Sequence, residues 1–471
     1  MMATILQANA RLVDPHDCTD AADDLTILQA ICDPLVRRKG TEHLPALARS
    51  WSTTDGQDWM FKLRPDVAFH DGTRVDAEAV RQSLQRMARP DKGYTLGAPG
   101  VWHQYLGAAK IDVEAPLVIR VRLAHPMADL LDVLEQAFIV APSVIEALDA
   151  GNLHRLMGSG PYKLSAQGPG CITAEAATRP QHPPNPQIEW RACPDEEIRQ
   201  SLLETGEAQV ATRIASIAKA PVTTIHHRGP VAIIYLLNAA HGPLSDPRLR
   251  RALHLGLDRT SLIDDVLDGA AEPLFGFVSP GHFGADPDAI DPYDPSAAKA
   301  LLAEAAHADG LVLNVDCPTR LPDEAERLTA CLADQLGSLG ITLNVTLHPD
   351  REAYAHMIRR KEIGDLCVFD SSPLSTFRVL YEKIDSRIAG SWWQGYRNPK
   401  VETLLDTARI TVDQKARASI YRQIYRLLQD DPPWLTLYNP IRTYGFAGQH
   451  LHIVMPVDGV LDVAGLPTFG S

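Results

Sequence analysis

The sequence predicts a mixed α/β fold in which sheets are flanked by helices. Strand-like apolar runs at 230–238 and 341–349 lie between segments with helical periodicity. The run LVLNVDCP at 311–318, a helical segment over about 322–339 and the run ITLNVTLHP follow one another directly. This order is typical of a βαβ unit with parallel strands.

The segment DWMFKLRPDVAFHDGTRVDAEAVRQSLQRM, which begins at Asp58, predicts two strands, a turn and a helix. Apolar residues alternate from Trp59 to Leu63, which is the period of a strand with one buried face. A second short strand is expected over 67–70. Asp76 is placed to cap the helix that follows.

Aspartate residues indicate the starts of further helices. Asp246 precedes Pro247 and Asp294 precedes Pro295, and a capping side chain followed by proline in the first turn is a typical helix start. Asp258 is expected to cap a third helix.

Composition limits the classes of protein that are possible. The chain has 471 residues, 45% of them hydrophobic, and a formal net charge of −14. The length suggests two or three domains. The negative charge argues against a nucleic-acid partner, because nucleic-acid binders normally carry a basic surface. No apolar run approaches the roughly 20 residues that span a bilayer.

Several motifs occur in a fixed order along the chain. They are VDPHD near the start, the segment from Asp58 described above, GSGPYKL at Gly158, LLNAAHGPLSDPRLRRALHLGLDRTSLIDDVL from Leu236, YDPSAAKALLAEA from Tyr293 and GYRNPKVETLLDTA from Gly395. Together they resemble the bacterial extracellular solute-binding proteins of ABC importers, in the family (family 5) that handles dipeptides, oligopeptides and nickel.

The resemblance implies a two-lobed periplasmic-binding-protein fold of type II, cluster C, with an extra domain. Lobe I would combine residues 1–33, 158–245 and 441–471, and lobe II would run over 246–440. The extra domain, 34–157, would pack on lobe I and contain the segment from Asp58 as scaffold.

The same resemblance implies the function. We expect the substrate-binding component of an ABC importer, which captures a small peptide or amino-acid-derived solute between two lobes and delivers it to the membrane permease. Closure of lobes on a solute requires no covalent chemistry. A nickel or other metal chelate is the alternative ligand, followed by an oligosaccharide or opine-like conjugate. We expect a monomer without a cofactor.

Two other classes of protein are alternatives. An enzyme is not expected, because the chain has no GxSxG, HExxH or GxxxxGK[ST] motif. A cytoplasmic peptide-holding protein would fit the start MMATILQANARLVDPH, which lacks the features of a secretory signal. The family resemblance instead favours a periplasmic or lipid-anchored protein whose signal sequence is absent from this chain.

Cysteine and histidine residues offer few strong signals. Cys171 with Cys193, and Cys317 with Cys331, are disulfide candidates in an oxidising compartment, and buried free thiols are the alternative. His450 and His452 share a face if extended and suit a transition metal, although a metal role is the less favoured interpretation.

The most informative candidate site follows the short apolar strand that ends at Phe369. Asp370, Ser371 and Ser372 supply a carboxylate and two hydroxyls at the carboxyl end of this strand, where open α/β sheets usually place ligands. Asp370 is suited to pair with a ligand ammonium. The alternative is that these residues only form a turn.

Arg378 and a group of aromatic residues follow this segment in the sequence. Arg378 is suited to bind a carboxylate with two hydrogen bonds, and an exposed helix arginine is the alternative. Trp392, Trp393 and Tyr396 suit a pocket wall that stacks on a ligand. One of the two adjacent tryptophans is expected in the core.

The resemblance adds candidates from the first part of the chain. Asp24 and Leu25 match a segment that reaches the ligand in relatives, and Trp102 lies about where nickel-binding relatives place a tryptophan. The arginine that those relatives carry before the segment equivalent to 135–143 is missing here.

Overall fold

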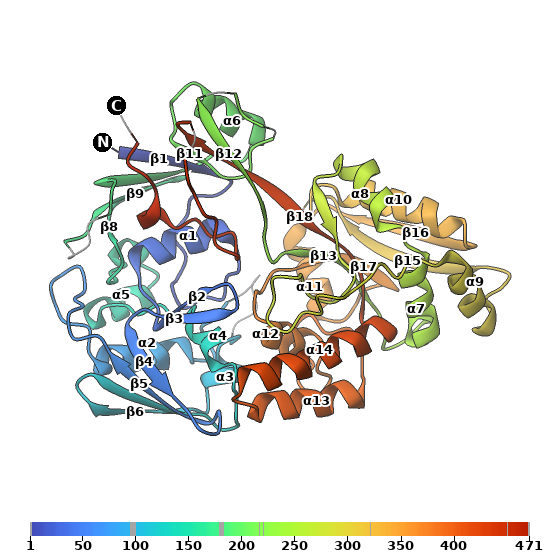
Figure 1. Ribbon diagram of the computed structural model, residues 1–471, viewed down its shortest axis with the longest axis horizontal. Coiled ribbons are helices and arrows are strands. Elements are labelled where there is room, and N and C mark those ends of the chain that lie inside the picture. Colours follow the sequence, from blue (N-terminus) through green and yellow to red (C-terminus); the bar gives the residue numbers. More distant parts are fainter. Residues whose placement is uncertain are drawn as a thin grey trace. The chain divides into compact units, whose positions relative to one another are not determined.

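The computed structural model describes residues 2–94, 100–178, 183–215, 217–219, 221–320, 322–449 and 451–469. Its contacts form two compact units (Figure 1). Unit 1 contains Met1–His227 and Arg442–Ser471, and unit 2 contains Arg228–Ile441. The finer division into two lobes and an extra domain over 34–157 stays a prediction.

Unit 1 contains a mixed sheet built on the first strand of the chain. Strand β1 (Met2–Gln7) pairs in parallel with β10 (Gln187–Ala192) and with β11 (Val210–Ala211). The antiparallel strands β9 (Cys171–Ala176) and β8 (Tyr162–Gly168) extend the β10 side. Unit 1 also contains helices α1 (Ala22–Ile31) and α6 (Glu196–Glu204). Strand β12 (Val222–Arg228) begins in unit 1 and ends at the first residue of unit 2.

A second sheet of unit 1 is antiparallel. Its strand order is β4 (Ala48–Ser52), β5 (Asp58–Leu63), β7 (Val118–Arg122) and β6 (Lys110–Ala115). Helix α2 (Ala77–Met87) packs on β6 and β7, and the Asp76 side chain accepts a hydrogen bond from Ala79 N at 2.9 Å, as predicted.

The predicted strand at 67–70 is wrong. The chain turns back at Gly72, whose φ is +86°, and Phe69 N donates to Thr73 O. Only a single bridge between Ala68 and Arg74 therefore forms. The other elements of unit 1 before residue 158 are the hairpin of β2 (Val36–Lys39) and β3 (Glu42–Pro45) and the short helices α3 (His103–Leu106), α4 (Leu130–Leu134) and α5 (Ile145–Asp149).

The sheet of unit 2 confirms the predicted βαβ unit. Strands β15 (Leu311–Pro318) and β16 (Ile341–His348) are parallel, and α10 (Ala325–Gly337) connects them. Strand β17 (Leu366–Ser371) is parallel to β15 on its other side. Strand β13 (Ala232–Leu237) then pairs antiparallel with β17 and with β18 (Trp434–Ala447), and β14 (Ala271–Pro273) also pairs with β18.

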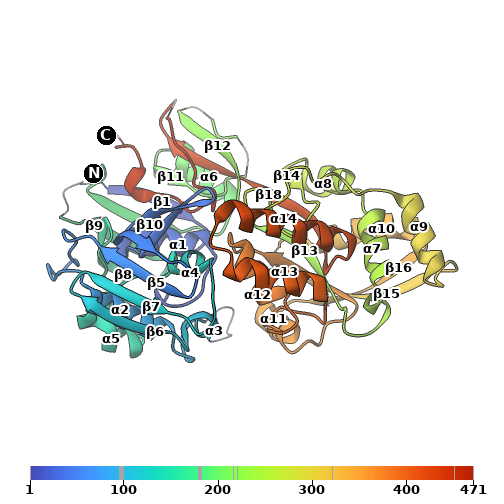
Figure 2. The same ribbon diagram turned by 60° about the horizontal axis from the view of Figure 1, so that its bottom comes forward.

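The predicted aspartate caps begin helices of unit 2 as expected. Asp246, Asp258 and Asp294 cap α7 (Pro247–Gly256), α8 (Arg259–Leu267) and α9 (Pro295–Glu304). Apolar side chains of these helices, of α10 and of the sheet form one buried core. The remaining helices are α11 (Arg351–Arg359), α12 (Thr376–Lys383), α13 (Pro399–Ile410) and α14 (Gln414–Asp430). Figure 2 shows α13 and α14 side by side.

All seven cysteines are free thiols, so neither candidate disulfide is present. Within the described part of the chain, no helix has both the length and the apolar character needed to cross a membrane.

Candidate functional site

Three parallel strands of unit 2 end at one edge of its sheet. Strands β15, β16 and β17 end at Pro318, His348 and Ser371, and we call this side of the sheet the carboxyl edge. Open α/β sheets bind ligands beyond the carboxyl ends of such strands. The position therefore fits the ligand site expected from the sequence.

Asp370 lies at this edge with its charge partly exposed. Its Oδ2 accepts a hydrogen bond from the Ser372 hydroxyl at 2.6 Å. Its Oδ1 lies 3.6 Å from Nη2 of Arg351, and 31% of the Asp370 side chain is exposed. The structure thus brings two of the predicted residues together and adds an arginine that the sequence analysis missed.

Ser371 and Arg378 point into unit 2. The buried Ser371 hydroxyl accepts a hydrogen bond from Lys383 Nζ at 3.0 Å. Arg378 is also buried, in α12, and its Nε donates to Glu382 Oε1 at 3.0 Å. Both side chains therefore support α12 and the end of β17, and their contact with a ligand stays a proposal.

The aromatic candidates divide between core and partly exposed positions. Trp392 is buried with its ring 4.9 Å from that of Phe369, whereas Trp393 is half-buried and donates from Nε1 to Tyr396 O at 2.6 Å. Tyr396 is buried, and the Arg250 guanidinium lies 5.6 Å from the centre of its ring. Burial raises the pKa of Tyr396. Trp393 is the one of these three with appreciable exposure.

The candidates in unit 1 are buried. Asp24, in the first turn of α1, accepts hydrogen bonds from Arg11 Nη2 at 3.3 Å and from the Thr19 hydroxyl at 3.2 Å. Leu25 follows it in the core. Trp102 caps α3 and has no exposed surface. Ligand contact by these three residues stays a proposal.

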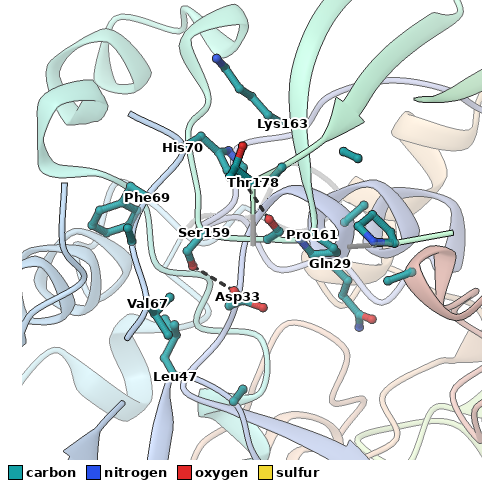
Figure 3. A pocket seen from close by; sticks show the side chains of 18 of the residues that line it. Gln29, Asp33, Leu47, Val67, Phe69, His70, Ser159, Pro161, Lys163 and Thr178 are labelled. Atoms are coloured by element: carbon teal, nitrogen blue, oxygen red, sulfur yellow. Dashed lines mark hydrogen bonds between the residues drawn. The ribbon is translucent and has the colours of Figure 1, made fainter. Parts of the chain in front are cut away.

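Unit 1 also contains a polar cavity of about 880 Å³ (Figure 3). Asp33 anchors its wall by accepting hydrogen bonds from the Ser159 hydroxyl at 3.0 Å and from Arg37 at 2.9 Å. His70 hydrogen-bonds to Gly160 O at 3.0 Å on another wall. None of the candidates from the sequence lines this cavity.

Arg351 is the functional candidate that the sequence analysis missed. It is the first residue of α11, directly after the capping Asp350. A basic residue in the first turn opposes the positive end of the helix dipole. An arginine in this unfavourable position, shortly after a strand of a parallel pair, is the sequence feature that could have indicated a functional role for Arg351.

The described part of the chain contains no cluster of potential metal ligands. Among the described residues, no group of three or more His, Cys, Asp or Glu side chains is placed to hold a metal ion. His450, one of the two histidines that suit a transition metal, lies outside the described residues.

Comparison with known proteins defines the class of the chain. Residues 42–375 match the model for bacterial extracellular solute-binding proteins, family 5 (middle). The chain therefore belongs to this family, as the motifs predicted.

Individual relatives cover nearly the whole chain. The glutathione-binding protein GsiB of Salmonella paratyphi A is 25% identical over 460 residues, which cover 91% of this chain and 87% of GsiB. The structure of DppA from Helicobacter pylori with the peptide STSA has a TM-score of 0.74 at 20% identity, covering 98% of this chain and 96% of DppA. NikZ from Campylobacter jejuni with Ni(L-His) has a TM-score of 0.76 at 19% identity, covering 95% and 94%. These likenesses confirm the predicted fold class.

Proposed function

We propose that this protein is the substrate-binding component of an ABC importer for a small peptide-type solute, of the class to which glutathione belongs. The match to the solute-binding family over residues 42–375 carries this proposal. The likeness to GsiB over 91% of the chain favours a peptide-type solute over other ligands of the family.

The carboxyl edge of unit 2 supports a charged, hydrogen-bonding solute. Asp370 offers a carboxylate that suits an ammonium group, and Ser372 holds its other oxygen in place. Binding of this kind needs no nucleophile or base, in accord with relatives that are named as binding proteins.

The setting of this function is also a proposal. We place the protein in the periplasm as a monomer that hands its solute to the membrane subunits of the importer. The family description, which names extracellular proteins, supports this location. The charge of −14 supports the absence of a nucleic-acid partner.

A thermal-shift screen of ligand-stripped protein tests the proposal. The panel contains glutathione, dipeptides, longer peptides, free nickel, nickel-histidine, opines and oligosaccharides. A ligand at a hundredfold excess over its dissociation constant stabilises the folded state by roughly 2.7 kcal/mol. We expect a shift with peptide-type solutes that is reduced in Asp370→Ala.

Two outcomes would contradict the proposed function. A shift with nickel-histidine and with no peptide-type solute would assign the protein to metal-chelate uptake. No shift with any member of the panel would remove the peptide-type solute from consideration.

A further inference from the structure

We propose that Arg351 binds a carboxylate of the solute next to the ammonium group at Asp370, so that the preferred solutes carry a free α-amino-acid head group. The inference rests on the proposed function and narrows its solute class. An α-amino-acid head group presents an ammonium and a carboxylate on one carbon. A peptide joined through a side-chain carboxyl, as in the γ-glutamyl link of glutathione, keeps this group, whereas an ordinary α-linked peptide loses it at its amino end.

Two hydrogen-bond donors of Arg351 lack acceptors. Its Nε and Nη1 are shielded from solvent and make no hydrogen bond with any described residue. Buried donors, charged ones above all, are normally paired, because an unpaired group loses its hydration without replacement. The Arg351 guanidinium therefore lacks hydrogen-bond acceptors for two of its nitrogen atoms.

Other acidic groups at this edge already accept hydrogen bonds from other donors. Asp350 Oδ1 accepts the amides of Glu352 and Ala353 as the cap of α11. Asp316 accepts Gly364 N at 2.7 Å and hydrogen-bonds to His348 at 2.7 Å. Among the described residues, the carboxylate paired with Arg351 is that of Asp370, and neither Asp350 nor Asp316 forms an ion pair with it.

Arg351 and Asp370 carry opposite charges but do not form a close contact. Nη2 of Arg351 and Oδ1 of Asp370 are 3.6 Å apart, which is longer than a charge-assisted hydrogen bond. Asp370 also holds the Ser372 hydroxyl at the shorter distance of 2.6 Å. Both members of the pair retain capacity for a partner of opposite charge.

The pair lies at the surface of unit 2, because 23% of the Arg351 side chain and 31% of the Asp370 side chain are exposed. The unpaired Nε and Nη1 of Arg351 are themselves shielded, so a solute carboxylate would have to displace the groups that cover them to reach these two donors. An amino-acid head group matches this pair, with its ammonium at Asp370 and its carboxylate at Arg351. Arginine binds carboxylates in a defined geometry that lysine does not reproduce.

Calorimetric titration with three matched tripeptides tests this assignment. The probes are γ-Glu-Cys-Gly, its α-linked isomer Glu-Cys-Gly, and 4-aminobutanoyl-Cys-Gly, which keeps the ammonium and lacks the α-carboxylate. We expect the wild-type protein to prefer the γ-linked probe over both others. The Arg351→Gln variant should bind the γ-linked probe roughly ten- to a hundredfold more weakly than the wild type does. Its affinity for the decarboxylated probe should change little.

Control variants separate a binding role from a structural one. Arg360→Gln removes an exposed arginine that pairs with Glu362 at the end of the same helix, and it should leave all three affinities unchanged. Arg351→Lys keeps the charge beside Asp370 and should still lose much of the preference for the γ-linked probe. It also provides a test if Arg351→Gln fails to fold.

Different outcomes overturn different claims. If the wild type binds the α-linked and γ-linked probes with equal affinity, Arg351 does not bind the α-carboxylate. The same conclusion follows if Arg351→Gln weakens the binding of all three probes equally. In both cases the proposed function stands. If the wild type binds none of the three probes and no dipeptide, both the inference and the peptide-type function fail.

Discussion

At the scale of single residues, ionic groups in unit 1 connect segments far apart in the sequence. Arg38 and His43 are cross-strand partners in the β2–β3 hairpin. Arg38 pairs with Asp132 at 2.7 Å and with Glu135 at 2.7 Å, and His43 Nε2 lies 3.2 Å from Asp132 Oδ1. The hairpin is thereby tied to α4 and its C-terminal cap.

This cluster gives folding stability a dependence on pH. Burial opposes the charged form of His43, but Asp132 and Glu135 outweigh it and raise its pKa from 6.5 to about 9. A raised pKa means that the stabilisation is complete below the unfolded-state pKa and is lost as pH rises through the folded-state pKa. We expect the wild type to lose up to about 3 kcal/mol between pH 6.5 and 9.

Denaturant unfolding at several pH values measures this effect. In His43→Gln the loss over pH 6.5 to 9 should be absent or much smaller, because glutamine does not titrate. Parallel stability-against-pH curves for the two proteins would show that the cluster does not hold a proton on His43 in this range.

At the scale of elements, the glycines of the GSGPY motif permit close packing against α1. A Cβ added at Gly158 would lie 2.3 Å from Ile31 O, and one at Gly160 would lie 2.4 Å from Ala30 O. Gly160 N also donates to Ile31 O at 2.9 Å. The motif therefore joins the end of α1 to the start of β8.

Substitution of these glycines should destabilise unit 1. Gly158→Ala forces backbone shifts, and overpacking of this kind typically costs about 1–3 kcal/mol. Gly168→Ala, at the other end of β8, meets open space and should be nearly neutral. Melting temperatures compare the two, and equal values would contradict the close packing.

The sequence predicts elements well where a local signal is strong. The caps at Asp76, Asp246 and Asp258 depend on nearby backbone amides, so the pattern of residues reveals them directly. The strand expected at 67–70 failed because the turn at Gly72 leaves room for only one bridge. Local periodicity does not reveal how far a pairing extends.

At the scale of the whole molecule, family motifs spread along the chain predict the fold, whereas individual site residues depend on long-range contacts. Arg351 and Asp370 are brought together by the parallel arrangement of β15, β16 and β17, which no local pattern specifies. Burial of Arg378 likewise follows from the packing of α12 in unit 2, whereas its ion pair with Glu382 is a local contact one turn along the same helix.

The most direct test of the central claim is calorimetric titration of ligand-stripped wild-type protein with glutathione. A solute-binding protein for this class should give saturable heat with one solute per chain, and Asp370→Ala should bind more weakly because it lacks the carboxylate at the end of β17. Absence of saturable binding to glutathione and to a panel of dipeptides, in a protein that retains its cooperative unfolding, would contradict a peptide-type solute.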